Sequence, residues 1–173
     1  MAQFYPQFTA GEDITADKLN SMLGLTAWKT ATESVTSSTT LQNDDELFLT
    51  VEANATYIMF MVLFHDSDTG AAADTKIGWS APASATMNWG VHGANTASTS
   101  STAVTSVNMQ TRTIIEVAAF GGGDSTGTMA LVGGTLVTSG TAGTFRLQWA
   151  QETSNAVATN VRAGSYLTLK RVA

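Results

Sequence analysis

Apolar and polar residues alternate with a period of two along much of this chain, the pattern of β-strands that bury one face. In the stretch 144–150, Phe145, Leu147 and Trp149 alternate with residues that are polar or small. Turn residues such as Gly, Asn, Asp and Ser separate the apolar stretches. Further strands are predicted at 27–36, 46–53, 57–64, 74–81, 84–92, 103–111, 112–120, 128–138, 156–161 and 165–172. The pattern therefore predicts an all-β fold, and we expect a jelly-roll-like antiparallel β-sandwich.

The predicted strand 57–64 differs from the others because it is apolar on both faces. One face of each sheet in a two-layer sandwich is normally in contact with water. We therefore expect a neighbouring subunit, or the N-terminal part of the chain, to cover the second face. The candidate subunit-interface residues are Tyr57, Met59, Met61 and Phe64.

Residues 1–25 differ in character from residues 26–173, which we assign to the sandwich domain. Thr15 is a suitable N-cap for a short helix over 16–23, and Gly24 is suited to end it. The segment is too short to bury its own aromatic side chains. We interpret it as an arm that docks on another protein, and the alternative is that it folds back over its own sandwich. The candidate anchoring residues are Phe4, Tyr5, Phe8, Leu19 and Leu23.

Charged residues make up 13% of the chain, against about 25% in typical soluble domains. A weakly charged surface suits subunits that pack against neighbours, although a β-rich composition alone would also lower the charge. The net charge is −6 and no basic run is present, so nucleic acid is not an expected partner. No stretch reaches the roughly 20 apolar residues of a membrane-spanning helix, and we expect no membrane association.

Residues that could carry chemistry are few. Asp66, Asp68 and Gly70 have the spacing of half a calcium loop, but alanines stand where further oxygen ligands are needed, so a surface turn is expected. The chain has no cysteine, which excludes disulfides and thiolate ligands. Neither His65 nor His92 lies in a recognisable catalytic motif. We expect no catalytic site, no metal and no cofactor.

Glycoside cleavage needs a pair of carboxylates, and few residues of this chain could form one. Their spacing in the sequence does not exclude such a pair, because the fold could bring them together. They are Glu46, Glu52, Glu116 and Asp124.

Three residues of the predicted hairpin 74–92 form a candidate glycan-binding site. Trp79, Trp89 and His92 are expected near one another, and aromatic rings beside polar groups can stack on a sugar. Tryptophans in a sandwich are more often buried, so the interpretation that we favour is that both belong to the core. The loop 93–102 beside them is expected to be exposed.

The C-terminal stretch also carries a family resemblance. The motifs G-T-x-x-L-x-W-A-Q (143–151), T-S-N (153–155) and V-R-A-G-S-Y-L (161–167) resemble the C-terminal part of exterior virion proteins of tailed bacteriophages, especially those of actinobacteria. The segment FTAGEDITADKLN (8–20) resembles the N-terminal arm of phage tail and head appendage proteins.

This resemblance implies a non-enzymatic structural protein on the exterior of a virion that is assembled in the host cytoplasm. It suggests a homotrimer that decorates the capsid through its arm, with the major capsid protein or a tail protein as partner. The alternative is a minor tail or fibre-tip protein that binds a host receptor or surface glycan. The short chain without a repeated shaft favours head decoration.

Overall fold

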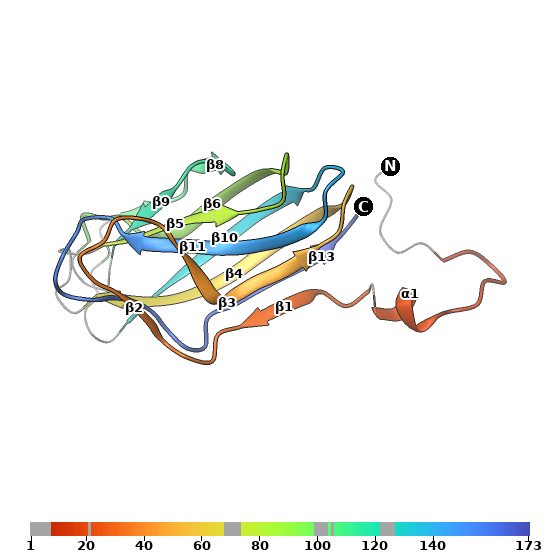
Figure 1. Ribbon diagram of the computed structural model, residues 1–173, viewed down its shortest axis with the longest axis horizontal. Coiled ribbons are helices and arrows are strands. Elements are labelled where there is room, and N and C mark those ends of the chain that lie inside the picture. The colour runs from red at the N-terminus through yellow and green to blue at the C-terminus, as the bar shows by residue number, and fades with distance from the viewer. Residues whose placement is uncertain (1–7, 21, 68–73, 99–103, 105, 122–126) are drawn as a thin grey trace.

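The computed structural model describes residues 8–20, 22–67, 74–98, 104, 106–121 and 127–173. Two antiparallel sheets pack face to face, with β3 and β11 in front and β4 and β10 behind in Figure 1. Sheet A contains β1 (Leu25–Trp28), β2 (Glu33–Val35), β4 (Thr56–Ser67), β6 (Thr86–Ala94), β7 (Val107–Asn108), β8 (Thr111–Thr113), β10 (Thr128–Val137), β12 (Thr159–Val161) and β13 (Tyr166–Arg171). Sheet B contains β3 (Gln42–Val51), β5 (Thr75–Ser80), β9 (Ala118–Phe120) and β11 (Gly143–Gln151).

The strand order is that of a jelly roll. Sheet A runs β1-β13-β4-β10-β6 and sheet B runs β3-β11-β5-β9. The pairs are nested along the chain, since β1 pairs with β13, β3 with β11, β4 with β10 and β5 with β9. The predicted all-β sandwich of jelly-roll type is confirmed, and β6, with the short strands β7 and β8 that pair with it, extends sheet A beyond this scheme.

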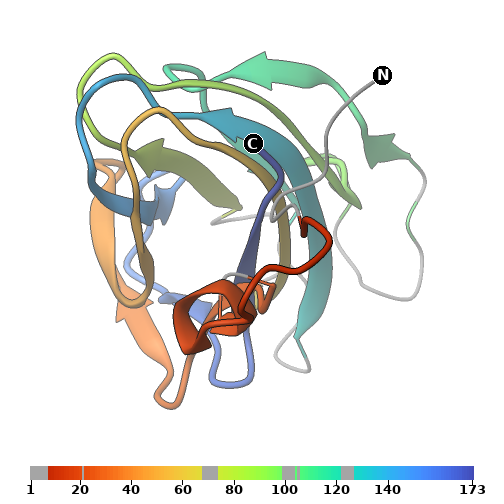
Figure 2. The same ribbon diagram turned by 90° about the vertical axis from the view of Figure 1, so that its right-hand side faces the viewer.

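The core lies between the two sheets and is filled by alternate residues of each strand. In β11, Phe145, Leu147 and Trp149 are fully buried, as their spacing predicted. In β13, Leu167 and Leu169 are buried, whereas Tyr166 lies on the opposite face. Viewed end-on in Figure 2, the sheets curve around this single core.

Three predicted strand arrangements were wrong. The stretch 112–120 is not one strand, since it contains the end of β8 in sheet A and, after a turn, β9 in sheet B. The stretch 27–36 is not one strand but contains the end of β1 and, after a break, β2. The segments 74–81 and 84–92 do not form a hairpin, because β5 belongs to sheet B and β6 to sheet A. The chain between them crosses from one sheet to the other, a change that period-two alternation cannot reveal.

The N-terminal arm contains a helix shorter than predicted. The helix α1 spans Ala16–Asn20 instead of 16–23, and Lys18 N donates to the Oγ1 of its cap, Thr15, at 3.3 Å. Figures 1 and 2 place α1 beyond the end of the sandwich where the C-terminus also lies. The chain enters sheet A at Leu25, the first residue of β1.

Candidate functional site

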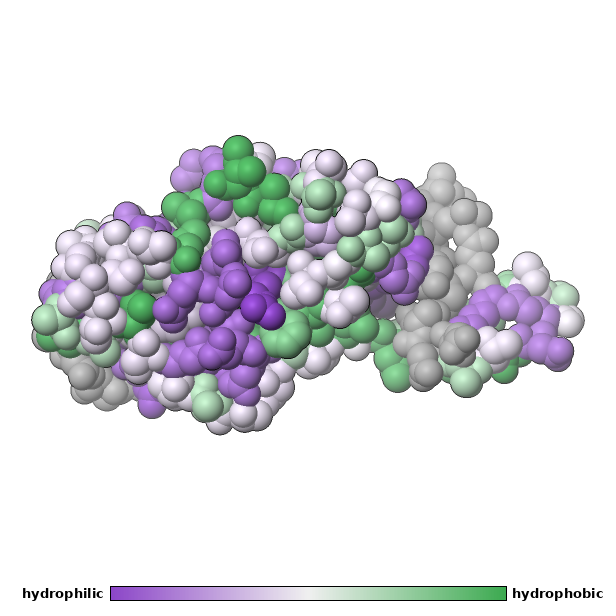
Figure 3. All heavy atoms as spheres, in the orientation of Figure 1, coloured by the Kyte–Doolittle hydropathy of each residue, from purple (hydrophilic) through white to green (hydrophobic). Residues whose placement is uncertain are grey.

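The outer face of sheet B is polar. Figure 3 shows hydrophilic side chains gathered over the middle of β3 and β11. In register across these strands, Gln148 lies opposite Asn43 and donates to its side chain at 2.9 Å. Phe48 is the exception, and the Arg146 guanidinium covers its ring at 4.4 Å from the centroid. This face has the character of a surface that contacts water.

The outer face of sheet A is apolar by contrast. On β4, Ile58 is 53% and Phe60 42% exposed, and Phe64 also points outward. On β10, Met129 lies opposite Phe64 and is exposed as well. The exposed apolar side chains on the outer side of β1, β4 and β10 are called the apolar face below; they are Trp28, Ile58, Phe60, Phe64, Met129 and Val137. A contiguous exposed apolar surface of this kind is typical of a contact surface for another molecule.

The candidate interface residues divide between the two faces of β4. Tyr57, Met59 and Met61 point into the core and are at most 2% exposed, so their assignment to an interface was wrong. Phe64 does lie on the outer face. Because strand 57–64 is apolar throughout, its sequence does not indicate which alternate set points inward.

The arm carries a second group of exposed apolar side chains. Its Phe8, Leu19 and Leu23 are all exposed, as are Ile14 and Met22. Lys18 lies over the Phe8 ring at 4.7 Å and pairs with Glu12. Phe4 and Tyr5 fall outside the described residues. The described part of the arm does not bury its apolar side chains against its own sandwich.

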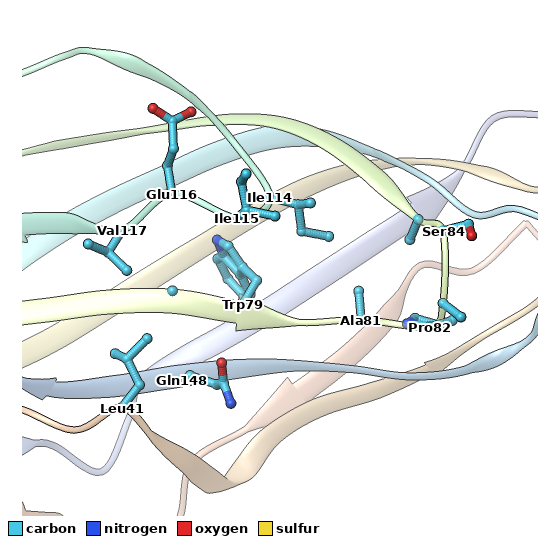
Figure 4. Close-up of a pocket in the computed structure, with 13 residues that line it drawn as sticks. Leu41, Trp79, Ala81, Pro82, Ser84, Ile114, Ile115, Glu116, Val117 and Gln148 are labelled. Carbon is cyan, nitrogen blue, oxygen red and sulfur yellow. The ribbon is translucent and has the colours of Figure 1, made fainter.

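A slot of about 360 Å³ opens beside β5 (Figure 4). Trp79 stands at its floor, and the turn that carries Ile114 and Ile115 lies above it. Glu116 points away from the slot in this view, and its carboxylate accepts bonds from Thr113 N at 2.6 Å and Thr113 Oγ1 at 2.8 Å. Its carboxylate is thus already bound, and the other side chains that line the slot are mostly apolar, with Ser84 and Gln148 as the polar ones.

The structure does not support the predicted glycan site. Trp79 and Trp89 do lie together, with ring centroids 5.8 Å apart in an edge-to-face arrangement, but they are only 7% and 2% exposed. Phe145 stacks on Trp79 at 4.7 Å. The ring faces that a sugar would need are therefore occupied by the core, and only His92 of the three is exposed.

His65 and Thr75 form the nearest approach to a catalytic pair. His65 Nδ1 and Thr75 Oγ1 are 3.0 Å apart, the distance expected between a base and a nucleophile. Both side chains are fully buried, and the ring of Phe120 packs edge-on against the histidine. Burial lowers the pKa of His65 from 6.5 to about 3. A substrate has no access to this pair, which has a structural role in the core.

Lys29 forms a buried ion cluster that the sequence did not indicate. Its ammonium donates to Glu33 at 2.6 Å and to Asp44 at 3.0 and 3.1 Å, and Lys29 and Asp44 are both fully buried. Burial alone would lower the pKa of Lys29, but the bonds to Glu33 and Asp44 outweigh it and the pKa is raised. The cluster fastens the segment after β1 to the start of β3.

Neither a metal site nor a membrane-spanning helix is found in the described parts of the chain. No group of three or more His, Cys, Asp or Glu side chains there is arranged to hold a metal ion. Asp66 of the partial calcium pattern instead contacts Asn160 and Arg162, and Asp68 and Gly70 lie outside the described residues. No helix in those same segments is long and apolar enough to cross a membrane.

Comparison with known proteins gives no family. No protein-family model and no curated protein sequence matches the chain. Structural similarity is found to infectious bursal disease virus proteins. The Gx strain structure is 10% identical over 87% of this chain and 39% of that chain, with a TM-score of 0.27. The Gt strain structure is 9% identical over 99% of this chain and 46% of that chain, also with a TM-score of 0.27.

A third structure, the VP2 subviral particle of the same virus, is 8% identical over 87% of this chain and 40% of that chain, with a TM-score of 0.23. The chain thus spans less than half the length of these proteins. At such TM-scores the likeness carries no argument about function.

Proposed function

We propose that this chain is a non-enzymatic structural protein on the exterior of a tailed-phage particle, where it decorates the capsid. Its arm anchors it to the particle, and the sandwich lies on the outside. The partner is the major capsid protein, and the protein itself is a homotrimer. This proposal rests on the resemblance of the arm and the C-terminal strands to phage exterior proteins.

One structural observation carries the proposal. The arm exposes Phe8, Ile14, Leu19, Met22 and Leu23 in a segment that lies beyond the sandwich. Exposed apolar side chains on a short extension are costly in water and favour a bound state. A partner that covers them would stabilise the protein by mass action.

The experiment that tests the proposal compares two chains on particles that lack the protein. The full-length chain is mixed with purified particles beside a shortened chain that begins at Gly24, which keeps β1 intact. A matched full-length variant, Phe8→Ser with Ile14→Ser, alters only exposed positions of the arm before α1. Circular dichroism and thermal unfolding check that each sandwich is folded.

Stoichiometric binding to heads by the full-length chain alone supports decoration through the arm. Binding by both chains contradicts the anchoring role of the arm. Binding to tails instead of heads overturns the capsid assignment in favour of a minor tail protein. If neither chain binds particles but both bind host cells, the protein is a receptor-binding module and the proposal is wrong.

A further inference from the structure

The packing and backbone conformation of the single chain do not explain why residue 133 is glycine. It lies in β10, an interior strand of sheet A between β4 and β6, where glycine lowers strand stability. Its φ is not positive, and a Cβ built on it would meet no atom within 4 Å. The next residue is different, because a Cβ on Gly134 would lie 2.6 Å from the Asn88 carbonyl oxygen and 2.8 Å from the Trp89 Cβ. Only Gly134 is explained by the packing of this fold.

Gly133 forms the floor of a furrow in the apolar face. It is paired with Phe60 on one side and with Gly90 on the other, so two adjacent strands lack side chains there. The furrow has a volume of about 230 Å³, and Phe60, Leu131, His92 and Met109 also line it. A glycine inside a strand often marks a place where another backbone approaches closely. This observation points to a polypeptide as the occupant.

The arm of the same chain carries three exposed apolar side chains that are not buried against the sandwich. They are Leu19, Met22 and Leu23, and they are called the ridge below. Met22 N donates to Leu19 O at 3.1 Å in the turn that follows α1. Leu23 is 71% exposed. The ridge is only a few residues from Leu25, where the chain joins the edge of sheet A.

The arm is acidic in sequence, and one basic side chain lies beside the apolar face. The arm carries Glu12, Asp13 and Asp17 against the single Lys18. On the apolar face, Lys170 lies beside the exposed Ile58 in register. It is exposed, and within the described segments of the chain it has no carboxylate partner.

We propose that the ridge Leu19–Leu23 of one copy lies in the Gly133 furrow on the apolar face of a second copy. This contact joins two different surfaces, so successive copies form a closed ring if the rotation between them closes and an open filament if it does not. The inference goes beyond the proposed function, because it concerns contacts between copies and needs no particle. It leaves the segment before α1 available for the particle.

Designed cysteines test the contact directly, because the chain has no cysteine of its own. A Leu23→Cys chain is mixed with a Met109→Cys chain under mild oxidation, and the mixed disulfide is identified by mass spectrometry. Met109 lines the furrow and is 70% exposed, so this change leaves Gly133 intact. The matched control replaces Met109→Cys by Thr50→Cys, an exposed position on the outer face of sheet B. We expect the mixed disulfide with Met109→Cys and its loss with Thr50→Cys. Equal yields from both would overturn the proposal.

A single chain that carries both Leu23→Cys and Met109→Cys distinguishes a second copy from the chain's own arm. The proposal predicts disulfides between chains, which appear as covalent oligomers. Disulfides formed only within one chain at all protein concentrations would show that the arm folds back on its own sandwich. This result would overturn the proposed contact between two copies.

Filling the furrow is the second test. Gly133→Val adds a side chain into open space, so the sandwich is expected to fold, and the unmixed protein is followed by analytical ultracentrifugation over a concentration series. We expect the oligomer of the unmodified chain to be lost both in Gly133→Val and in the chain that begins at Gly24. Gly140→Val, where a Cβ also meets no atom within 4 Å, is the matched control and should retain the oligomer.

An oligomer that survives both changes, or an unmodified chain that is monomeric throughout, would contradict the proposal. Copies that associate through the arm but do not bind particles would leave this inference intact and defeat the proposed function. Chains that bind particles but do not associate with one another would contradict this inference and leave the proposed function intact.

Discussion

Trp28 and Tyr166 stack on the outer surface of sheet A, with ring centroids 6.0 Å apart and planes within 7°. They are paired in register at the edge where β1 meets β13. Phe60 of β4 lies 6.5 Å from the Tyr166 ring. The apolar face thus continues from the interior strands to the edge at which the arm joins the sheet.

Trp28 should report whether this face is covered. It is 59% exposed, whereas the other three of the four tryptophans are buried. We expect acrylamide to quench one component of the tryptophan emission in the monomer, and we expect this component to be protected in the oligomer. Trp28→Phe should remove it. Equal quenching in monomer and oligomer would mean that this end of the face stays open in the assembly.

His65 should make the fold sensitive to acid. Because its pKa falls from 6.5 to about 3 on folding, the unfolded chain gains a proton below pH 6.5 that the folded protein does not bind. The contribution of His65 to the free energy of unfolding is therefore constant above pH 6.5. As the pH falls from 6.5 to about 3, the free energy of unfolding decreases by about 1.4 kcal/mol per pH unit. Urea unfolding at a series of pH values measures this slope.

The variant His65→Gln, which can still hydrogen-bond Thr75, should flatten the slope even if it lowers stability overall. His92→Gln is the matched control at an exposed histidine and should keep the slope of the unmodified chain. A slope that is unchanged in His65→Gln would contradict the assignment.

The Lys29 cluster should tolerate loss of the pair better than loss of one member. Lys29→Met leaves the fully buried Asp44 without its cation, and the expected loss is about 3–5 kcal/mol in the free energy of unfolding. Lys29→Met with Asp44→Leu removes the unpaired charge and should recover part of this loss. The double variant still loses the bonds that Asp44 accepts from Glu46 N at 3.0 Å and Leu47 N at 2.7 Å. If the double variant is no more stable than Lys29→Met, the loss does not come from an uncompensated charge.

Alanine substitutions at two adjacent glycines of β10, Gly133 and Gly134, should have different effects on the free energy of unfolding. Gly134→Ala forces a Cβ against Asn88 and Trp89, and we expect it to destabilise the fold by about 3 kcal/mol. Gly133→Ala meets no atom and should be neutral or stabilising by about 0.5–1 kcal/mol, because alanine restricts the unfolded chain. Thermal unfolding of the isolated chains, under conditions where each is monomeric, makes this comparison. A loss at Gly133 equal to that at Gly134 would remove the basis for an external role of Gly133.

The sequence predicted the sandwich because alternation is strong in strands such as β11, where polar residues separate Phe145, Leu147 and Trp149. The sequence could not show which alternate residues of β4 point into the core, because apolar residues occupy both faces of this strand. Tyr57 and Met59 were therefore assigned to an interface although they are buried. The core position of Trp79 and Trp89 was predicted correctly, but their strands were predicted as one hairpin, and β5 and β6 in fact belong to different sheets.

The Gly133 furrow also lies beyond sequence reasoning. Gly133 and Gly134 are adjacent and identical in type, and only the register with β6 shows that the backbone and side chains of Asn88 and Trp89 occupy the space beside the second one. The exposed arm is different. Its apolar residues lie in a segment too short to bury them, and this could be read directly from the chain.

The nested strand pairs also affect when the protein becomes able to assemble. β1 pairs with β13, the first and last strands that the structure describes, so residues far apart in sequence must meet before sheet A is complete. Folds dominated by such distant contacts form slowly, because loop closure precedes the gain from pairing. A nascent chain that ends before Tyr166 leaves one edge of β4 and all of β1 without their partner, and Trp28 without Tyr166. Prematurely terminated chains therefore lack a finished contact surface, and the topology itself excludes them from the assembly.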